Sequence, residues 1–200
     1  IWAGSVRDGL IRISRSEMNT YGDVHWGLKN GLSNPTVLYL YQDPSEDYIW
    51  IGTDGEGLNR FDPDKNEFTH YKSTQKTKVV SIASYSENEL AISVYSDRIW
   101  IFNKNTGTSR PLEVHDEHLN YQFRYAGLGV NLANENDGSL LIISNLIYRF
   151  DKKTGRCVKI QKPGNPKATS NMLVIGNDER GTWLHDNFDI LPELIENGLD

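Results

Sequence analysis

The chain has 200 residues, with 21 Lys and Arg against 27 Asp and Glu and a formal net charge of −6. A mildly acidic chain without a basic stripe is unsuited to nucleic acid, whose binding depends on neutralising phosphates. No apolar stretch approaches the roughly 18 residues that a membrane span needs. The single cysteine, Cys157, cannot form an internal disulfide. Seventeen glycines and 10% aromatic residues favour short strands joined by tight turns.

A two-stranded unit with a glycine-rich turn occurs near the N-terminus, over residues 1–13, and again over residues 48–62. In the second copy, the strand Ile49–Thr53 is separated from the strand Leu58–Asp62 by the sequence Asp-Gly-Glu-Gly. The Trp and Arg residues of the first copy recur 48 residues later in the second. Glycine tolerates the positive φ angles that tight hairpin turns require. The recurrence predicts a repeated β-hairpin.

The same layout continues along the chain, in the strand pairs 90–94 with 98–102 and 140–144 with 146–150. Aligning the last apolar residue of each second strand gives Ile13, Phe61, Phe102 and Phe150, with spacings of 48, 41 and 48 residues. Further apolar stretches and polar turns precede and follow each hairpin. Four short strands in each period of about 40 to 50 residues are typical of a β-propeller blade.

The predicted fold is therefore all-β, a β-propeller with about four to five blades of four antiparallel strands in this chain. We expect a closed propeller to need more blades, so the chain is interpreted as part of a larger one, with closure as four blades as the alternative. In that alternative, the strand near 172–177 completes the first blade. The expected units are a partial blade at 1–26, blades at 32–72, 79–114 and 129–161, a partial blade at 172–191 and an unassigned tail at 192–200.

The unit that begins Gly31-Leu32-Ser33-Asn34-Pro35, with Ile49-Trp50-Ile51-Gly52-Thr53 and Gly57-Leu58-Asn59-Arg60-Phe61-Asp62, resembles the two-component regulator propeller repeat. The first hairpin also matches well. The units at 79–114 and 129–161 have the same layout but lack the Trp-Ile-Gly-Thr sequence. In the last partial unit, Trp183 matches part of that sequence. The resemblance extends to about residue 190.

This resemblance implies seven-bladed propellers in the periplasmic sensor portion of an inner-membrane hybrid protein with a histidine kinase and a response regulator. It also implies detection of glycans or oligosaccharides, transmission of the signal across the membrane, and a possible homodimer of the full-length sensor. Under this interpretation the chain itself is not an enzyme. The alternatives are a propeller that docks a protein partner or a second copy, and a propeller lyase or glycan hydrolase.

Two groups of residues have the composition of a metal site. The segment His115-Asp116-Glu117-His118 is interpreted as a solvated loop, because no helix follows that would place both histidines on one side. Asp62, Asp64 and Asn66 mimic the first ligands of a calcium loop, but Glu67 stands where such a loop needs glycine. A hairpin turn explains them better, and no metal or cofactor is expected.

The expected ligand site is the propeller face formed by the turns between second and third strands and by the connections between blades. One such connection, from His115 to Ala126, is unusually rich in aromatic residues. Aromatic rings beside an arginine can stack on sugars and bind hydroxyls or a uronate, although the same residues can instead pack the loop onto its own blade. The candidate ligand-binding residues are Asp54, Tyr95, Asp97, His118, Tyr121, Arg124 and Tyr125.

Overall fold

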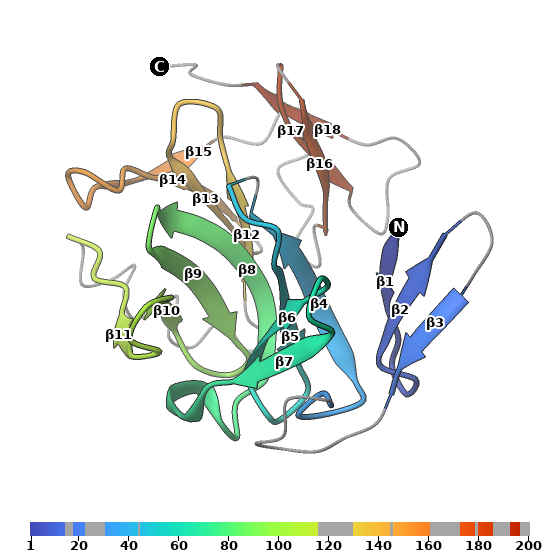
Figure 1. The fold of residues 1–200 in the computed structure, drawn as a ribbon. Helices are drawn as coiled ribbons and strands as arrows, with labels where there is room; N and C mark the ends of the chain where they lie inside the picture. The colour runs from blue at the N-terminus through green and yellow to red at the C-terminus, as the bar shows by residue number, and fades with distance from the viewer. Residues whose placement is uncertain are drawn as a thin grey trace.

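The computed structural model contains five separate antiparallel β-sheets that follow one another along the chain (Figure 1). It describes residues 1–14, 18–22, 31–43, 45–115, 130–144, 146–160, 173–178, 180–185 and 193–196. In these residues no helix is long and apolar enough to cross a membrane.

The first two sheets contain seven strands. The first sheet has the order β1-β2-β3, with β1 at Trp2–Gly4, β2 at Leu10–Ile13 and β3 at Met18–Tyr21. The second has the order β4-β5-β6-β7. Its strands are β4 (Val37–Gln42), β5 (Ile49–Thr53), β6 (Leu58–Asp62) and β7 (Glu67–His70), and the short 3₁₀ helix η1 (Lys72–Thr74) follows.

The third and fourth sheets repeat the four-stranded order of the second. The third contains β8 (Val79–Ser86), β9 (Glu89–Val94), β10 (Ile99–Asn103) and β11 (Ser109–Pro111). The fourth contains β12 (Asn131–Asn134), β13 (Leu140–Ile143), β14 (Ile147–Phe150) and β15 (Cys157–Ile160).

The fifth sheet has the order β16-β17-β18, with β16 at Leu173–Asp178, β17 at Gly181–His185 and β18 at Glu193–Glu196. Strand β16 pairs with β17, so it does not complete the first sheet as the four-blade alternative required. Strand β18, which lies in the tail that the sequence left unassigned, pairs with β17.

Consecutive sheets contact one another through their leading strands, in the succession β1–β4, β4–β8, β8–β12 and β12–β16. Figure 1 shows the series from the dark blue first sheet, through the green third sheet, to the red fifth sheet. Sheets of up-and-down strands that pack side by side in this way are the blades of a β-propeller. The predicted fold class is confirmed.

The strand register explains the repeat that the sequence shows. Three phenylalanines pair with an apolar residue at or next to the start of the preceding strand. The pairs are Phe61 with Ile49, Phe102 with Leu90, and Phe150 with Leu140. All six side chains are buried. Each unit therefore places a large apolar side chain at the same depth of its sheet, where it fills the space next to the neighbouring sheet.

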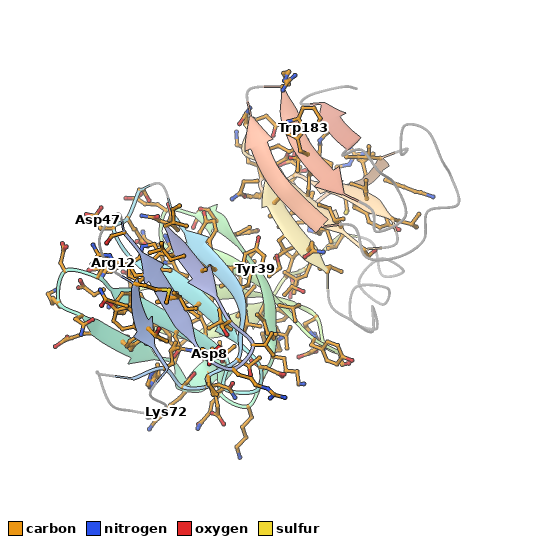
Figure 2. All side chains as sticks on the ribbon, turned by 90° about the vertical axis from the view of Figure 1, so that its right-hand side faces the viewer. Asp8, Arg12, Tyr39, Asp47, Lys72 and Trp183 are labelled. Carbon is orange, nitrogen blue, oxygen red and sulfur yellow. The ribbon has the colours of Figure 1, made fainter. Side chains whose placement is uncertain are left out.

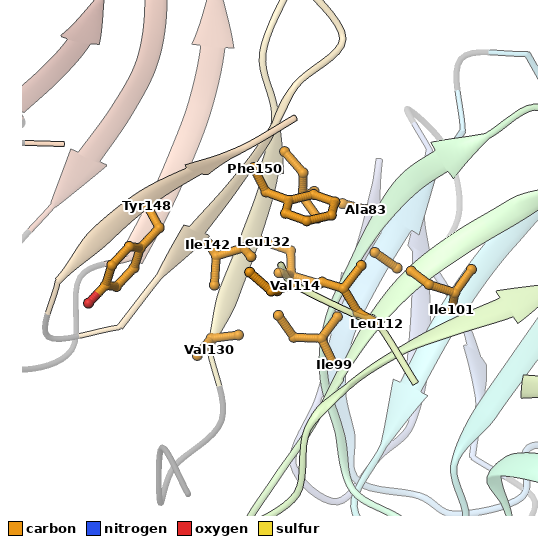
Figure 3. Packing of buried hydrophobic residues seen from close by; sticks show 12 residues of the cluster. Ala83, Ile99, Ile101, Leu112, Val114, Val130, Leu132, Ile142, Tyr148 and Phe150 are labelled. Atoms are coloured by element: carbon orange, nitrogen blue, oxygen red, sulfur yellow. The ribbon is translucent and has the colours of Figure 1, made fainter. Parts of the chain in front are cut away.

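Three of the apolar cores lie between successive sheets. The first unites residues of sheets one and two, the second unites sheets two and three, and the third unites sheets three and four. Figure 3 shows the third, in which Leu132, Ile142 and Phe150 meet Ile99 and Leu112. Because the core is divided among the sheet boundaries, each blade depends on its neighbours for burial of its apolar faces.

The glycine of the Trp-x-Gly sequence lies where the next blade passes closest. A Cβ atom on Gly52 would stand 2.4 Å from the backbone oxygen of Val79 in β8, and one on Gly4 would stand 2.5 Å from the Val37 side chain in β4. The third sheet has Ser93 at this register position, and its hydroxyl accepts a 2.9 Å hydrogen bond from the backbone N–H of Val130. The motif therefore marks an inter-blade contact that serine can also make.

A buried ion pair joins the second and third sheets on the opposite side from these glycines. Lys104, in the β10–β11 turn, donates hydrogen bonds to Asp43 at 2.8 Å and to Glu46 at 3.0 Å. The Lys104 and Asp43 side chains are only 5% and 7% exposed. Glu46 also accepts a 3.0 Å hydrogen bond from the indole N–H of Trp50. These contacts connect the turn between β4 and β5 to the next blade.

The carboxyl group of Asp43 should make the fold sensitive to acid. Burial raises its pKa, but hydrogen bonds from Lys104 and Ser45 outweigh this effect and leave the pKa below the usual value of 3.8. A carboxylate with a lowered pKa stabilises the fold fully above its unfolded-state pKa, and this contribution is lost as pH falls through the folded-state pKa.

We therefore expect the difference in unfolding free energy between wild type and Asp43→Asn to be constant near neutral pH and to narrow below about pH 4. Urea unfolding at a series of pH values measures this difference. A difference that stays the same down to pH 3 would contradict the role assigned to Asp43.

Candidate functional site

The turns between second and third strands and the connections between sheets lie at one end of the first three sheets. Figure 2 shows Asp8, from the turn between β1 and β2, and Lys72, from the connection after β7, at this end. Asp47, from the turn between β4 and β5, lies at the opposite end. Asp54 lies in the turn between β5 and β6, and Tyr95 lies in the turn between β9 and β10. Both turns join a second strand to a third strand, which is why the sequence predicts that the two residues share a face.

The turn that carries Asp54 is held by hydrogen bonds from three segments. The backbone and hydroxyl of Thr53 both donate to the Gly57 carbonyl, at 3.0 and 2.8 Å. Gly57 has a φ of +75°, and its missing side chain leaves room for the Thr74 carbonyl. The Asn34 side chain donates a 2.8 Å hydrogen bond to the Asp54 carbonyl.

The Gly-Leu-Ser-Asn sequence before β4 acts as a clamp on this turn. The Ser33 backbone N–H donates to the buried side chain of Asn59 at 2.9 Å, and Asn59 donates back to the Ser33 hydroxyl at 2.7 Å. The Ser33 hydroxyl lies 3.3 Å from the Glu56 carbonyl, to which it donates. The motif residues therefore hold the backbone of the turn at residues 54–57 in place.

Lys78 joins Asp54 to Tyr95 across the boundary between the second and third sheets. Its backbone pairs with Asp54 in an antiparallel bridge, and its ammonium lies 2.7 Å from the Asp54 carboxylate. The Tyr95 backbone N–H donates to the Lys78 carbonyl at 2.9 Å. The Lys78 ammonium is 5.5 Å from the centre of the Tyr95 ring, within the range of a cation–π contact.

These three side chains are accessible. The Lys78 side chain is 49% exposed and Tyr95 is 40% exposed. The hydrogen bond from Lys78 to the Asp54 carboxylate raises the pKa of the ammonium, so it is charged at neutral pH. We call Asp54, Lys78 and Tyr95 the boundary cluster.

Asp97 lies in the same turn as Tyr95, but its carboxylate is used within that turn. It accepts a 3.1 Å hydrogen bond from the indole N–H of Trp100 and lies 3.6 Å from the Arg98 guanidinium. The Arg98 guanidinium in turn lies 5.7 Å from the centre of the Trp100 ring. Asp97 therefore orients its own turn, beside the boundary cluster.

The structure thus brings Asp54 and Tyr95 together through a residue that the sequence interpretation missed. Lys78 directly precedes Val79, the first residue of β8, and this position places it on the same face as the neighbouring turns. The other predicted residues, His118, Tyr121, Arg124 and Tyr125, lie outside the described residues, and their proposed role stays a prediction.

The residues 62–66 form a turn. Asp62 accepts hydrogen bonds from the backbone N–H groups of Asp64 and Lys65, both at 3.1 Å, and from the Lys65 ammonium at 2.8 Å. Within the described part of the chain, no group of three or more His, Cys, Asp or Glu side chains could hold a metal ion.

A carboxylate, an ammonium and an accessible aromatic ring in one patch can bind a hydroxylated molecule. The carboxylate only accepts hydrogen bonds and the ammonium only donates them, while the ring offers an apolar face for stacking. The boundary cluster therefore offers a hydrogen-bond acceptor, a donor and an apolar face in one accessible patch.

Comparison with solved structures identifies proteins of the same fold. The chain aligns over 100% of its length with 27% of the extracellular domain of the Bacteroides thetaiotaomicron protein named as the hybrid two-component system BT3049, at 16% identity and a TM-score of 0.68. For BT4673 of the same bacterium, the alignment covers 98% of this chain and 29% of that domain, at 22% identity and a TM-score of 0.63.

An ancestral GH74 enzyme also shares the fold, at 13% identity and a TM-score of 0.59, with 100% of this chain aligned to 30% of that one. The sequence matches no protein-family model and no curated protein. The chain spans less than a third of the length of these three solved structures. These likenesses define a propeller fold that both two-component extracellular domains and an enzyme adopt.

Proposed function

We propose that this chain is part of the extracytoplasmic ligand-sensing propeller of a two-component signalling protein, and that its ligand is a glycan or oligosaccharide. The complete protein would then be an inner-membrane histidine kinase, with the propeller in the periplasm and its signal passed across the membrane. In this proposal a seven-bladed propeller includes the blades described above, and the full-length sensor forms a homodimer.

The observation that supports this proposal most strongly is the fold shared along the whole chain with extracellular domains of hybrid two-component systems. The propeller-repeat motif supports it independently, because Gly52, Ser33 and Asn59 have structural roles that a blade of this type needs. The boundary cluster adds an accessible patch with the chemistry of carbohydrate binding.

A second candidate function is protein docking, with a partner or a second copy of the chain. The first sheet carries an exposed apolar row, in which Ile13 pairs with Met18 and exchanges hydrogen bonds with Ile1. Ile1 is 90% exposed and Met18 is 69% exposed. The corresponding row of the second sheet packs against the first sheet, so a sheet-like surface would fit on this row.

Isothermal titration calorimetry with a panel of oligosaccharides, followed by chromatography of the mixtures, tests the proposal. We expect heat of binding with at least one oligosaccharide and no cleavage product. Cleavage would instead assign the chain to the propeller enzymes. An absence of binding to every sugar, together with a dimer that forms as concentration rises, would support the docking function.

A further inference from the structure

We infer that the boundary cluster is a subsite for an uncharged sugar ring with two adjacent free hydroxyl groups, rather than for a uronate or a sulfated sugar. This inference rests on the proposed function and narrows its ligand class. It follows from the charge balance of the site, from the positions of its hydrogen-bonding atoms and from the exposed ring beside them.

The charges at this boundary balance in pairs. The Lys78 ammonium lies 2.7 Å from the Asp54 carboxylate, and the Arg98 guanidinium lies 3.6 Å from the Asp97 carboxylate. An anionic group that approached Lys78 would meet the negative charge of Asp54 at short range. Two like charges about 4 Å apart repel by roughly 1 kcal/mol in water and by about 4 kcal/mol near a protein surface, so this repulsion offsets most of the attraction between the anion and the ammonium. An uncharged hydroxyl meets no such penalty.

The hydrogen-bonding atoms of the cluster match a pair of neighbouring hydroxyls. The Lys78 ammonium has three N–H donors and uses one on Asp54, so it can donate to one sugar oxygen. The Asp54 carboxylate has further acceptor capacity, so it can accept from the adjacent hydroxyl. Because donor and acceptor are side by side, two hydroxyls on neighbouring ring carbons fit this pair.

Tyr95 provides the stacking surface beside this pair. Tyr95 is 40% exposed, and the centre of its ring lies 5.5 Å from the Lys78 ammonium. A sugar ring bound through two hydroxyls at the ammonium and carboxylate would place its C–H face over an apolar surface of this kind.

The three residues are held in position before a ligand arrives. The Asp54 and Lys78 backbones form a bridge, and the Tyr95 backbone donates to the Lys78 carbonyl. A site whose backbone is already ordered loses less conformational entropy when it binds. The cluster also spans two blades, so occupancy would connect the second sheet to the third.

Calorimetry with matched panels of uncharged oligosaccharides and uronate-containing oligosaccharides tests the inference on the whole chain. The variants are Lys78→Met, Tyr95→Ala and the control Lys65→Met. Lys65 forms an ion pair of similar length with Asp62, at 2.8 Å, but this pair lies in the β6–β7 turn, away from the cluster. Thermal unfolding of Lys78→Met and Lys65→Met should match wild type, since exposed ion pairs contribute little to stability.

We expect wild type to bind an uncharged oligosaccharide, with an affinity that changes little between about 50 mM and 500 mM salt. Lys78→Met and Tyr95→Ala should each weaken binding roughly tenfold or more, because each removes a direct contact, while Lys65→Met should bind as wild type does.

Binding of uronate oligosaccharides only, with an affinity that falls steeply as salt rises, would overturn the inference and leave the proposed function standing. Tight binding of an uncharged sugar that is unaffected by Lys78→Met and Tyr95→Ala would overturn it in the same way. Binding of neither panel would overturn both the inference and the proposed function.

Discussion

Replacement of Lys104 with methionine is expected to destabilise the chain by about 3–5 kcal/mol, because it leaves two carboxylates without their cation. Asp43 is buried, and the Lys104 ammonium is its only cationic partner among the described ion pairs. Methionine fills a similar volume but cannot donate hydrogen bonds, so the charge of Asp43 stays buried and uncompensated. Chemical unfolding monitored by tryptophan fluorescence measures the loss, and Trp50 contributes directly because its indole donates to Glu46.

The matched control for this experiment is Lys65→Met. Lys65 pairs with Asp62 at 2.8 Å, like Lys104 with Asp43, but the Lys65 side chain is largely exposed. An exposed pair contributes at most about 1 kcal/mol, so this variant should unfold nearly as wild type does. Equal, small losses in both variants would show that the Lys104 contacts do not hold the second and third sheets together.

The second large effect is expected for Gly52→Ala, which should destabilise the chain by about 1–3 kcal/mol or more. The added Cβ would stand 2.4 Å from the backbone oxygen of Val79, so strand β8 would have to move away from β5. Movement of β8 also disturbs the core shared by the second and third sheets, which contains Trp50 and Ile92. Denaturant unfolding measures the effect.

Two further glycine variants separate the causes of this loss. Gly4→Ala at the equivalent position meets the Val37 side chain, and its nearest backbone atom is the Val37 oxygen at 3.7 Å, so it should cost less than a 2.4 Å approach to a backbone oxygen. A Cβ atom at Gly138 would contact nothing within 4 Å, so Gly138→Ala should lose stability only because its φ of +88° is unfavourable for alanine. If Gly52→Ala is no worse than Gly138→Ala, the close approach of the blades does not explain the Trp-x-Gly motif.

Much of the fold could be predicted because the repeat is carried by local patterns. Trp2 and Trp50 mark the same strand position, and Phe61, Phe102 and Phe150 mark the next strand, so the period is visible without knowledge of contacts. Loss of the glycine in the third unit is explained by Ser93, whose small hydroxyl bonds to the next blade.

The contacts between blades could not be predicted in the same way. Lys104 and Asp43 are 61 positions apart, and the turn containing Lys104 reads as an ordinary polar turn. Lys78 was missed for a related reason, since a lysine just before a strand is a common surface residue until its partners are known. The sequence identifies which residues share a face, while packing decides which of them meet.

The crystal structure of the chain with the tightest-binding oligosaccharide tests the proposed function and its site most directly. We expect an uncharged sugar ring over Tyr95, with adjacent hydroxyls within hydrogen-bond distance of the Asp54 carboxylate and the Lys78 ammonium. A sugar bound at the opposite end of the blades, near Asp47, would contradict the assignment of the boundary cluster as the binding site.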